Sequence, residues 1–127
     1  MEFRGVVLDG VGQAKTFTQL EWVREQVRAK IGFDPYPGTL NLRVKDADAL
    51  WACRAGPGIL IVPGAAGYCA ARCYRMQVGG VPAAWILPEV PGYPEDVVEL
   101  LAPVSLRQTL NLNTGVTVTV CLESGLG

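Results

Sequence analysis

The chain has 127 residues, 50% of them hydrophobic, and a net charge of -1. This length suits one domain with its own core, and the balanced charge offers no broad basic surface for nucleic acid or an anionic membrane. The N-terminal segment Met1–Leu8 lacks the pattern of a signal peptide, and the longest uncharged stretch, Ala55–Ala71, is interrupted by glycine and proline. We expect a single cytoplasmic domain over residues 1–127, a monomer or a weak homo-oligomer, with no membrane and no nucleic-acid partner.

The N-terminal part of the chain predicts a strand, a glycine loop and the main helix. Phe3–Asp9 is rich in β-forming residues and runs into a glycine loop over Gly10–Phe17. Thr18 and Glu21 form a capping-box signature, and apolar residues then recur at helical spacing until Gly32. These apolar residues are Leu20, Val23, Val27 and Ile31. We expect this apolar stripe to pack on a sheet.

A turn and a strand with two different faces follow the helix. Pro37 and Gly38 are typical of the two central positions of a tight turn, and a strand begins at about Thr39. Side chains alternate across a strand, so one face is predicted to be core and the other a polar row. The core face carries Leu40, Leu42 and Val44, and the polar face carries Thr39, Asn41 and Arg43.

The rest of the chain predicts further short elements. The expected elements are a helical turn at Asp46–Cys53, a buried strand at Ile59–Val62, a hairpin of Cys73–Val78 and Val81–Leu87 around Gly79-Gly80, a short helix at Leu106–Leu110 capped by Ser105, and a strand at Val116–Leu122. About six short strands with one main helix favour a closed β-barrel, which leaves no free sheet edge.

Four cysteines occur without a secretory signal, so an even count does not indicate disulfides. The four are Cys53, Cys69, Cys73 and Cys121. We expect reduced thiols that pack as small buried apolar side chains. Cys69 and Cys73 have a spacing that could suit a metal, but the chain has no histidine and no second close pair, which makes structural zinc the weaker alternative.

Three groups of residues could carry chemistry. The glycines of Gly10-Val11-Gly12 could let backbone N–H groups approach phosphates, with Lys15 adding charge, although an ordinary loop is the simpler alternative. Thr39 and Asn41 present hydroxyl and amide oxygens that would suit Mg²⁺ with a nucleotide, or they are a solvent-facing pair. The acidic stretch Tyr93–Glu99 ends in a carboxylate that enters an apolar segment, or it carries surface acids on a helical turn.

Taken together, these groups resemble the archaeal CTP-dependent riboflavin kinase family in the same order from about Arg4 to Leu122. The matching blocks are Gly5-Val6-Val7 with Gly10-Val11-Gly12, the run IGFDPYPGTLNL at Ile31–Leu42, the run YPEDVVELLAP at Tyr93–Pro103, and Leu106-Arg107. The resemblance implies a mainly β fold, namely a six-stranded cradle-loop, riboflavin kinase-like β-barrel with one main helix and short helical turns.

The resemblance also implies an activity, in which the γ-phosphate of CTP moves to the 5′-hydroxyl of riboflavin to give FMN and CDP, with Mg²⁺ as cofactor. It assigns the metal to Thr39 and Asn41, and the flavin to Pro91 and Glu99, where Glu99 either orients the flavin or acts as a base. It assigns the nucleotide to Val11, Gly12, Gln13, Ala14, Lys15, Thr16, Val104, Ser105, Leu106 and Arg107.

The chain departs from the family pattern at three positions. Gln13 and Ala14 stand where the family commonly has an acid and a glycine, and Pro91 stands where it usually has a flavin-contacting threonine. Proline offers neither a hydroxyl nor an N–H group. Two alternatives follow: a diverged module that binds flavin or nucleotide without catalysis, and a kinase of the same scaffold that acts on another small alcohol.

Overall fold

A computed structural model describes residues 1–10 and 13–123, except for the side chains of residues 13–15. Its strands are β1 (Glu2–Leu8), β2 (Leu40–Arg43), β3 (Ile59–Ile61), β4 (Ala71–Val78), β5 (Val81–Pro88), β6 (Val97–Leu101) and β7 (Thr117–Leu122). Its helices are α1 (Gln13–Thr18), α2 (Glu21–Gln26), the π-helix η1 (Val27–Ile31), α3 (Ala47–Cys53) and α4 (Leu106–Thr109).

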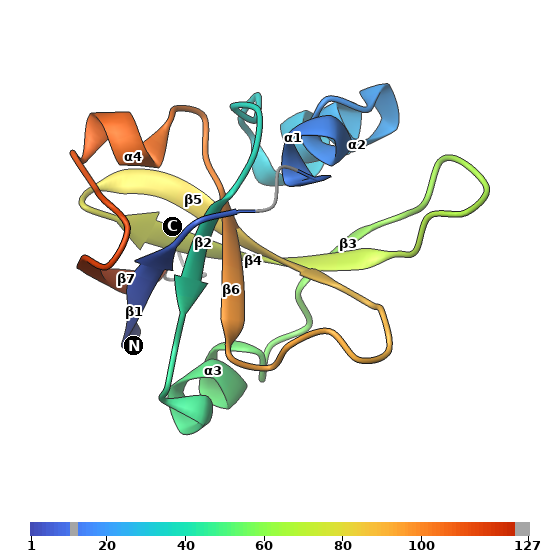
Figure 1. Cartoon of the computed structure of the whole chain (residues 1–127). Helices are drawn as coiled ribbons and strands as arrows, with labels where there is room; N and C mark the ends of the chain where they lie inside the picture. The colour runs from blue at the N-terminus through green and yellow to red at the C-terminus, as the bar shows by residue number, and fades with distance from the viewer. Residues whose placement is uncertain (11–12, 124–127) are drawn as a thin grey trace.

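Six of the strands close into an antiparallel barrel. The sheet order is β3-β4-β5-β6-β2-β1-β7, and pairing of β4 with β7 completes the ring, so β3 stays outside it as an extension of β4. In Figure 1, α3 lies at one end of the barrel, and α4 lies towards the opposite end, as do α1 and α2. The predicted six-stranded, mainly β barrel is confirmed.

One of the six barrel strands differs from the prediction. The sequence pattern counted Ile59–Val62 among the strands and did not identify β6, whose run VVELL was considered only as part of an acidic turn. The inward face of β6 is buried, and its outward face is half-buried at Val97 and Glu99 and buried at Leu101, so its sequence lacks the apolar–polar alternation of a strand with one face in water. β3 was also predicted to be buried, but Leu60 is 39% exposed and Val62 is 49% exposed.

The barrel interior is filled by the inward-facing side chains of every barrel strand. Its largest fully buried members include Trp85, Leu42, Met76, Leu100, Val7 and Val98. Gly5 on β1 permits this packing, because a Cβ there would lie 2.9 Å from the Cβ of Leu42. The predicted core face of β2 is confirmed, since Leu40, Leu42 and Val44 are all buried.

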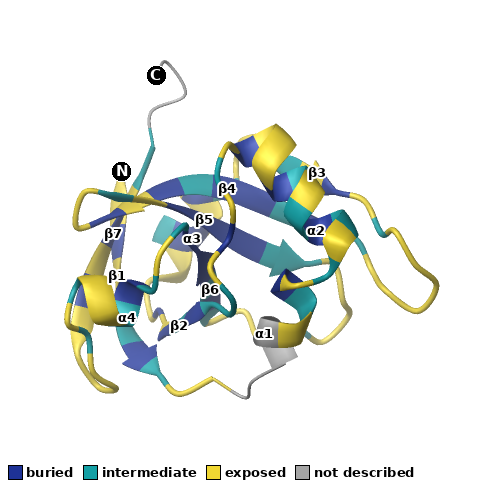
Figure 2. Cartoon of the chain, turned by 90° about the horizontal axis from the view of Figure 1, so that it is seen from above, coloured by how far each residue is buried: buried dark blue, intermediate teal, exposed yellow. Residues whose placement is uncertain are grey.

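A second cluster lies between the outer face of the sheet and the main helix. Figure 2 shows α2 with its buried side turned towards the sheet. Val23, Val27 and Ile31 contribute the helix side of this cluster, as the predicted apolar stripe requires. The helix passes from α2 into η1 and ends at Gly32, whose φ of 103° suits glycine.

The N-terminal end of this helix differs from the prediction. Leu20 is the N-cap of α2 and makes no side-chain capping bond, so the predicted capping box of Thr18 and Glu21 is wrong. Thr18 instead ends α1 and is fully buried, and its hydroxyl accepts a 2.9 Å hydrogen bond from the backbone N–H of Gly38. The loop predicted over Gly10–Phe17 is likewise wrong where α1 forms, in line with the good helix propensity of its Gln-Ala-Lys start.

Several short elements agree with the sequence. Asp46 caps α3 by accepting from the N–H of Ala49 at 3.1 Å, and Ser105 caps α4 by accepting from Gln108 at 3.3 Å. The predicted hairpin of β4 and β5 and the final strand β7 are confirmed. In the part of the chain that the structure describes, no helix is long and apolar enough to span a bilayer. The single-domain boundaries, cytoplasmic location and oligomeric state stay predictions.

The free edge of β3 is covered by side chains of the helix. The amide of Gln26 donates to the carbonyl of Val62 and accepts from its N–H, both at 2.8 Å. Lys30 donates to the carbonyl of Leu60 at 2.7 Å. Hydrogen-bonding groups at the edge of the sheet are therefore paired by helix side chains in place of another strand.

The cysteines divide into two pairs. Cys53 and Cys73 are buried, whereas Cys69 and Cys121 are exposed, and all four are free thiols. The prediction of buried apolar side chains is therefore wrong for the exposed pair. Burial raises the pKa of the Cys53 thiol, and it raises that of Cys73 to about 12.

Candidate functional site

The polar face predicted for β2 lies on the outer surface of the barrel, beside the outward-facing side chains of the neighbouring strand β6. Asn41 pairs with Glu99 across the β2–β6 ladder, and Thr39 precedes β2 by one residue. Thr39, Asn41 and Glu99 are all partly buried. The amide nitrogen of Asn41 donates to the carbonyl of Thr39 at 3.4 Å, which leaves the amide oxygen of Asn41 for another partner.

Glu99 connects two hydroxyl groups that come from different parts of the chain. Its Oε1 accepts a 2.9 Å hydrogen bond from Thr39 Oγ1, and its Oε2 accepts a short hydrogen bond from the phenol of Tyr93. Burial raises the pKa of Tyr93, and the hydrogen bond to the Glu99 carboxylate raises it further. The phenol therefore stays protonated and remains a donor at neutral pH.

Thr39 also lines a hollow of about 170 Å³ beside the start of α4. Val104–Arg107, which the resemblance assigns to the nucleotide, line the same hollow together with the turn Tyr36–Gly38. The structure thus brings the predicted metal residue Thr39 beside this predicted nucleotide segment. Leu106 itself is 4% exposed and packs into the barrel core, so its side chain is a core residue.

Arg107 connects this hollow to the glycine loop. Its guanidinium donates to the carbonyl of Leu8 at 2.8 Å and to Thr114 Oγ1 at 3.2 Å, and it lies 3.6 Å from Asp9. Leu8 ends β1, and Gly10 follows shortly after it. Arg107 therefore binds the backbone just before the glycine loop, and part of its side chain lines the hollow.

A second, larger cavity of about 480 Å³ lies beside the loop between β5 and β6. Pro91 and Tyr93 line it from that loop, and Tyr74 and Trp85 line it from the barrel. Pro91, the predicted flavin residue, is exposed at this cavity, whereas Glu99 is connected to it through Tyr93. Glu99 therefore lies between a residue of each hollow, Thr39 on one side and Tyr93 on the other.

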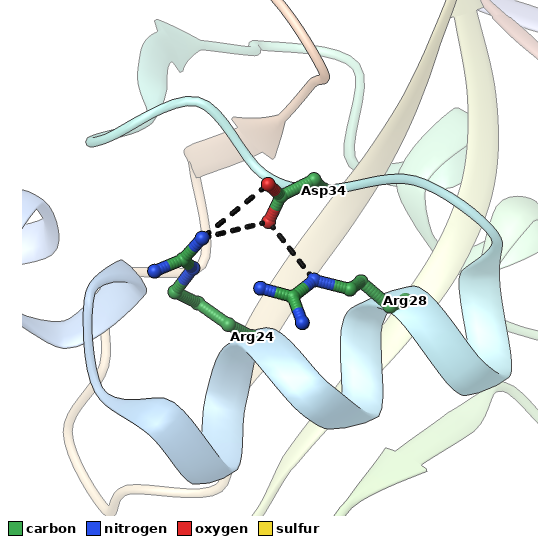
Figure 3. Close-up of polar contacts among 3 residues, drawn as sticks. All are labelled: Arg24, Arg28 and Asp34. Atoms are coloured by element: carbon green, nitrogen blue, oxygen red, sulfur yellow. Dashed lines mark hydrogen bonds and ion pairs between the residues drawn. The ribbon is translucent and has the colours of Figure 1, made fainter.

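The turn that leads to Thr39 is held at three points. Asp34 accepts from Arg24 and Arg28 of the main helix, with the closest contacts at 3.3 Å and 3.2 Å (Figure 3). The N–H of Tyr36 donates to the carbonyl of Ala102 at 2.8 Å, and that of Gly38 donates to Thr18. These contacts fix the backbone on which Thr39 stands, and the two guanidinium groups lower the pKa of Asp34.

Part of the predicted nucleotide site cannot be compared with the structure. Val11 and Gly12 lie outside the described residues, as do the side chains of Gln13, Ala14 and Lys15. The backbone of residues 13–15 belongs to α1, and Thr16 on the same helix is exposed. α1 ends at Thr18, whose contact with Gly38 connects it to the turn before Thr39.

Sequence reasoning identified Thr39, Asn41 and Glu99 but missed two residues that join them to their surroundings. Tyr93 was seen only as the first letter of a matching block, and Thr18 only as a helix cap. The contact between Tyr93 and Glu99 depends on the turn between β5 and β6, and no sequence pattern indicated it. The contact between Thr18 and Gly38 depends on how α1 packs, which the sequence pattern did not indicate.

The oxygen atoms at this site are suitable ligands for a hard cation such as Mg²⁺. Thr39 and Asn41 offer neutral oxygens, with the Glu99 carboxylate hydrogen-bonded to Thr39. Mg²⁺ is usually held by one or two protein groups together with waters and substrate phosphates, so such a small donor set suffices. Within residues 1–10 and 13–123, no cluster of three or more His, Cys, Asp or Glu side chains forms a separate metal site.

The fold and the site define a small closed antiparallel barrel with a hydroxyl, amide and carboxylate site on its outer face, between two hollows. Residues 7–122 match the family model CTP-dep_RFKase, which is described as domain of unknown function DUF120. The chain belongs to this family, and the resemblance drawn from the sequence is confirmed.

Curated proteins named riboflavin kinase are similar to the chain over most of its length. The identity is 36% over 94% of the chain for the protein of Methanocella arvoryzae, 34% over 91% for that of Archaeoglobus fulgidus, and 35% over 87% for that of Pyrobaculum aerophilum. The matches cover 56%, 52% and 55% of these relatives, so the chain spans about half the length of the curated relatives it matches.

Proposed function

We propose that the chain is a riboflavin kinase that transfers the γ-phosphate of CTP to the 5′-hydroxyl of riboflavin. In this reaction a bond forms between the ribityl oxygen and the γ-phosphorus, and the bond between that phosphorus and the β,γ-bridging oxygen breaks. The products are FMN and CDP, and the hydroxyl proton is released. Family membership and the names of the relatives support the acceptor, and the family label supports CTP.

One observation carries the proposal: the Glu99 carboxylate is hydrogen-bonded to Thr39, which lines the smaller hollow, and to Tyr93, which lines the larger one. In this reading the smaller hollow takes part of the nucleotide and the larger one takes the acceptor. Phosphoryl transfer depends mainly on positioning and charge stabilisation, so a site held rigidly between two substrates suits it.

Thr39 and Asn41 would hold Mg²⁺, which neutralises phosphate charge when it is bound. Arg107 would add positive charge beside the hollow that takes the nucleotide. Glu99 accepts two hydroxyl hydrogen bonds and retains further lone pairs, so it can orient a riboflavin hydroxyl. This arrangement favours an orienting role for Glu99 over that of a base, because a loose transition state asks little of a base.

The proposal is tested by incubating the purified chain with riboflavin, Mg²⁺ and, separately, CTP, ATP, GTP and UTP. We expect FMN by chromatography with CTP and much less with the other nucleotides. FMN from another nucleotide at the same rate would contradict the dependence on CTP. Absence of FMN with every nucleotide would contradict the kinase activity.

A non-catalytic binding module is the second candidate, and Pro91 is the observation that favours it. Pro91 faces the larger cavity at the position where the family usually carries a flavin-contacting threonine, and it has no hydroxyl to offer. Calorimetry distinguishes the two functions. Binding of CTP or riboflavin without turnover would support the module, whereas turnover would exclude it. Transfer to another alcohol but not to riboflavin would indicate a different acceptor.

A further inference from the structure

The loop between β5 and β6 presents Tyr93 through a tight turn. The N–H of Tyr93 donates to the carbonyl of Val90 at 3.2 Å, which closes a four-residue turn with Pro91 and Gly92 at its centre. Gly92 has a φ of 82°. Proline at the second position and a glycine with positive φ at the third are the signature of a type II turn. Pro91, which cannot replace the hydroxyl of a threonine, thus has a structural role in placing Tyr93.

The hydroxyl of Tyr93 helps to orient the Glu99 carboxylate towards Thr39. An ionised carboxylate only accepts hydrogen bonds, so both Thr39 and Tyr93 must be donors to it. Thr39 uses its single hydroxyl hydrogen in this bond, which leaves the lone pairs of its oxygen for a cation. The Tyr93 bond holds the second carboxylate oxygen and so fixes the plane of the group that orients Thr39.

We propose that Tyr93 is a positioning residue of the phosphoryl-transfer site, presented by the Pro91-Gly92 turn and acting through Glu99 on Thr39. This inference rests on the proposed function. In this chain Pro91 would stiffen the turn before Tyr93, whereas the threonine usual at this position in the family contacts the flavin through its hydroxyl. The phenol therefore connects the wall of the larger cavity to the metal-binding hydroxyl.

The first test is Tyr93→Phe, which removes one hydroxyl and keeps the ring. We expect kcat to fall about tenfold, the effect of one lost hydrogen bond to a charged group. The half-saturating Mg²⁺ concentration should rise several-fold by the same reasoning, and the midpoint of urea unfolding should fall by no more than the loss of this one hydrogen bond explains. Tyr68→Phe is the matched control, because Tyr68 is exposed and its ring packs against Phe17 and Trp22. It should leave kcat and the Mg²⁺ dependence unchanged.

The second test asks whether Tyr93 acts through Glu99. In a Glu99→Gln background, Tyr93→Phe should cause little further loss, because residues that act as a unit are not additive. An equal factor in both backgrounds would overturn the inference. So would a Tyr93→Phe protein with the kcat and Mg²⁺ dependence of the unaltered chain.

Riboflavin binding, measured by quenching of flavin fluorescence, separates this inference from the proposed function. An unaltered chain that neither binds riboflavin nor makes FMN overturns both. An active chain in which Tyr93→Phe has no effect overturns only the role of Tyr93. If the unaltered chain binds riboflavin without transfer, the proposed function fails, and the variants are compared by their riboflavin dissociation constants with Mg²⁺ and CTP present. Equal constants then overturn the role of Tyr93.

Discussion

Gly10 lies so close to Asn41 that a Cβ on Gly10 would be 2.7 Å from the amide nitrogen of Asn41. The closeness follows from the register of β1 and β2, which pairs Leu8 with Asn41 just before the chain turns away at Gly10. The start of the glycine loop and one of the two predicted metal ligands are therefore packed against each other.

We predict that Gly10→Ala moves the Asn41 side chain without unfolding the barrel. Its new methyl group meets the end of a side chain, which can rotate away, so the free energy of unfolding should change by less than about 1 kcal/mol. FMN formation should fall and the half-saturating Mg²⁺ concentration should rise. Gly56→Ala is the control, because a Cβ at Gly56 has no described neighbour within 4 Å. Normal kinetics in Gly10→Ala would contradict a role for Asn41.

Thr39→Val and Asn41→Ala test the metal pair directly. Groups that merely orient metal ligands are worth about 10 to 100-fold, so loss of a ligand should lower turnover by about 100-fold or more. Neither side chain belongs to the buried core, so circular dichroism spectra and unfolding midpoints should stay near those of the unaltered chain. Arg43→Ala removes an exposed side chain of β2 and serves as the control. Normal turnover in both site variants would remove the proposed metal site.

Asp34 is predicted to make stability depend on acid pH. Its hydrogen bonds with Arg24 and Arg28 lower its pKa below the ordinary value of 3.8. A lowered folded-state pKa adds stability that is fully present above the unfolded value and is lost as pH falls through the folded value. The difference in unfolding free energy between the unaltered chain and Asp34→Asn should therefore be constant above about pH 5 and shrink in more acidic solution.

Urea unfolding across a pH series measures this difference, and it should be small because the side chains of all three residues are partly exposed to water. In an Arg24→Met, Arg28→Met background the same comparison should show no trend with pH. A difference that persists unchanged into strong acid would contradict the ion pairs as its source.

The cysteines should react in two groups. Iodoacetamide attacks the thiolate, so the buried Cys73, with its pKa raised to about 12, should resist alkylation at pH 8. Cys53 is also buried with a raised pKa and should be protected as well. Peptide mass spectrometry should find rapid modification of Cys69 and Cys121 in the folded chain, and of all four after unfolding. Rapid labelling of Cys73 in the folded chain would contradict its burial.

Local patterns in the sequence were enough to predict most elements. Alternation identified β2 and β7, and the turn at Gly38, whose φ is 98°, followed from residue chemistry alone. β6 was missed because apolar residues occupy both of its faces around Glu99, which removes the alternation, and a run of five residues is too short for periodicity to distinguish a strand from a helical turn. α1 was missed because the two glycines just before it, Gly10 and Gly12, suggested a loop that continues to Phe17.

The site was predicted as separate residues but not as a connected arrangement. Thr39 and Asn41 were predicted to share a face because they lie two residues apart on one strand. Their relation to Glu99 depends on the pairing of β2 with β6, which joins positions about 60 residues apart and depends on the closed barrel. The Tyr93 contact depends further on a turn between β5 and β6, so it required the whole fold.

The amide of Gln26 beside Val62 also bears on the solubility of the protein. The edge of a sheet with free peptide groups and apolar side chains can recruit strands of other molecules and begin a fibril. Here Val62 and Leu60 expose such side chains, yet the N–H and carbonyl of Val62 are bonded to Gln26 and the carbonyl of Leu60 is bonded to Lys30. Two polar side chains of the helix thereby protect the apolar segment Ile59–Val62 from intermolecular sheet formation. In many proteins prolines or charged residues on the edge strand itself have this effect.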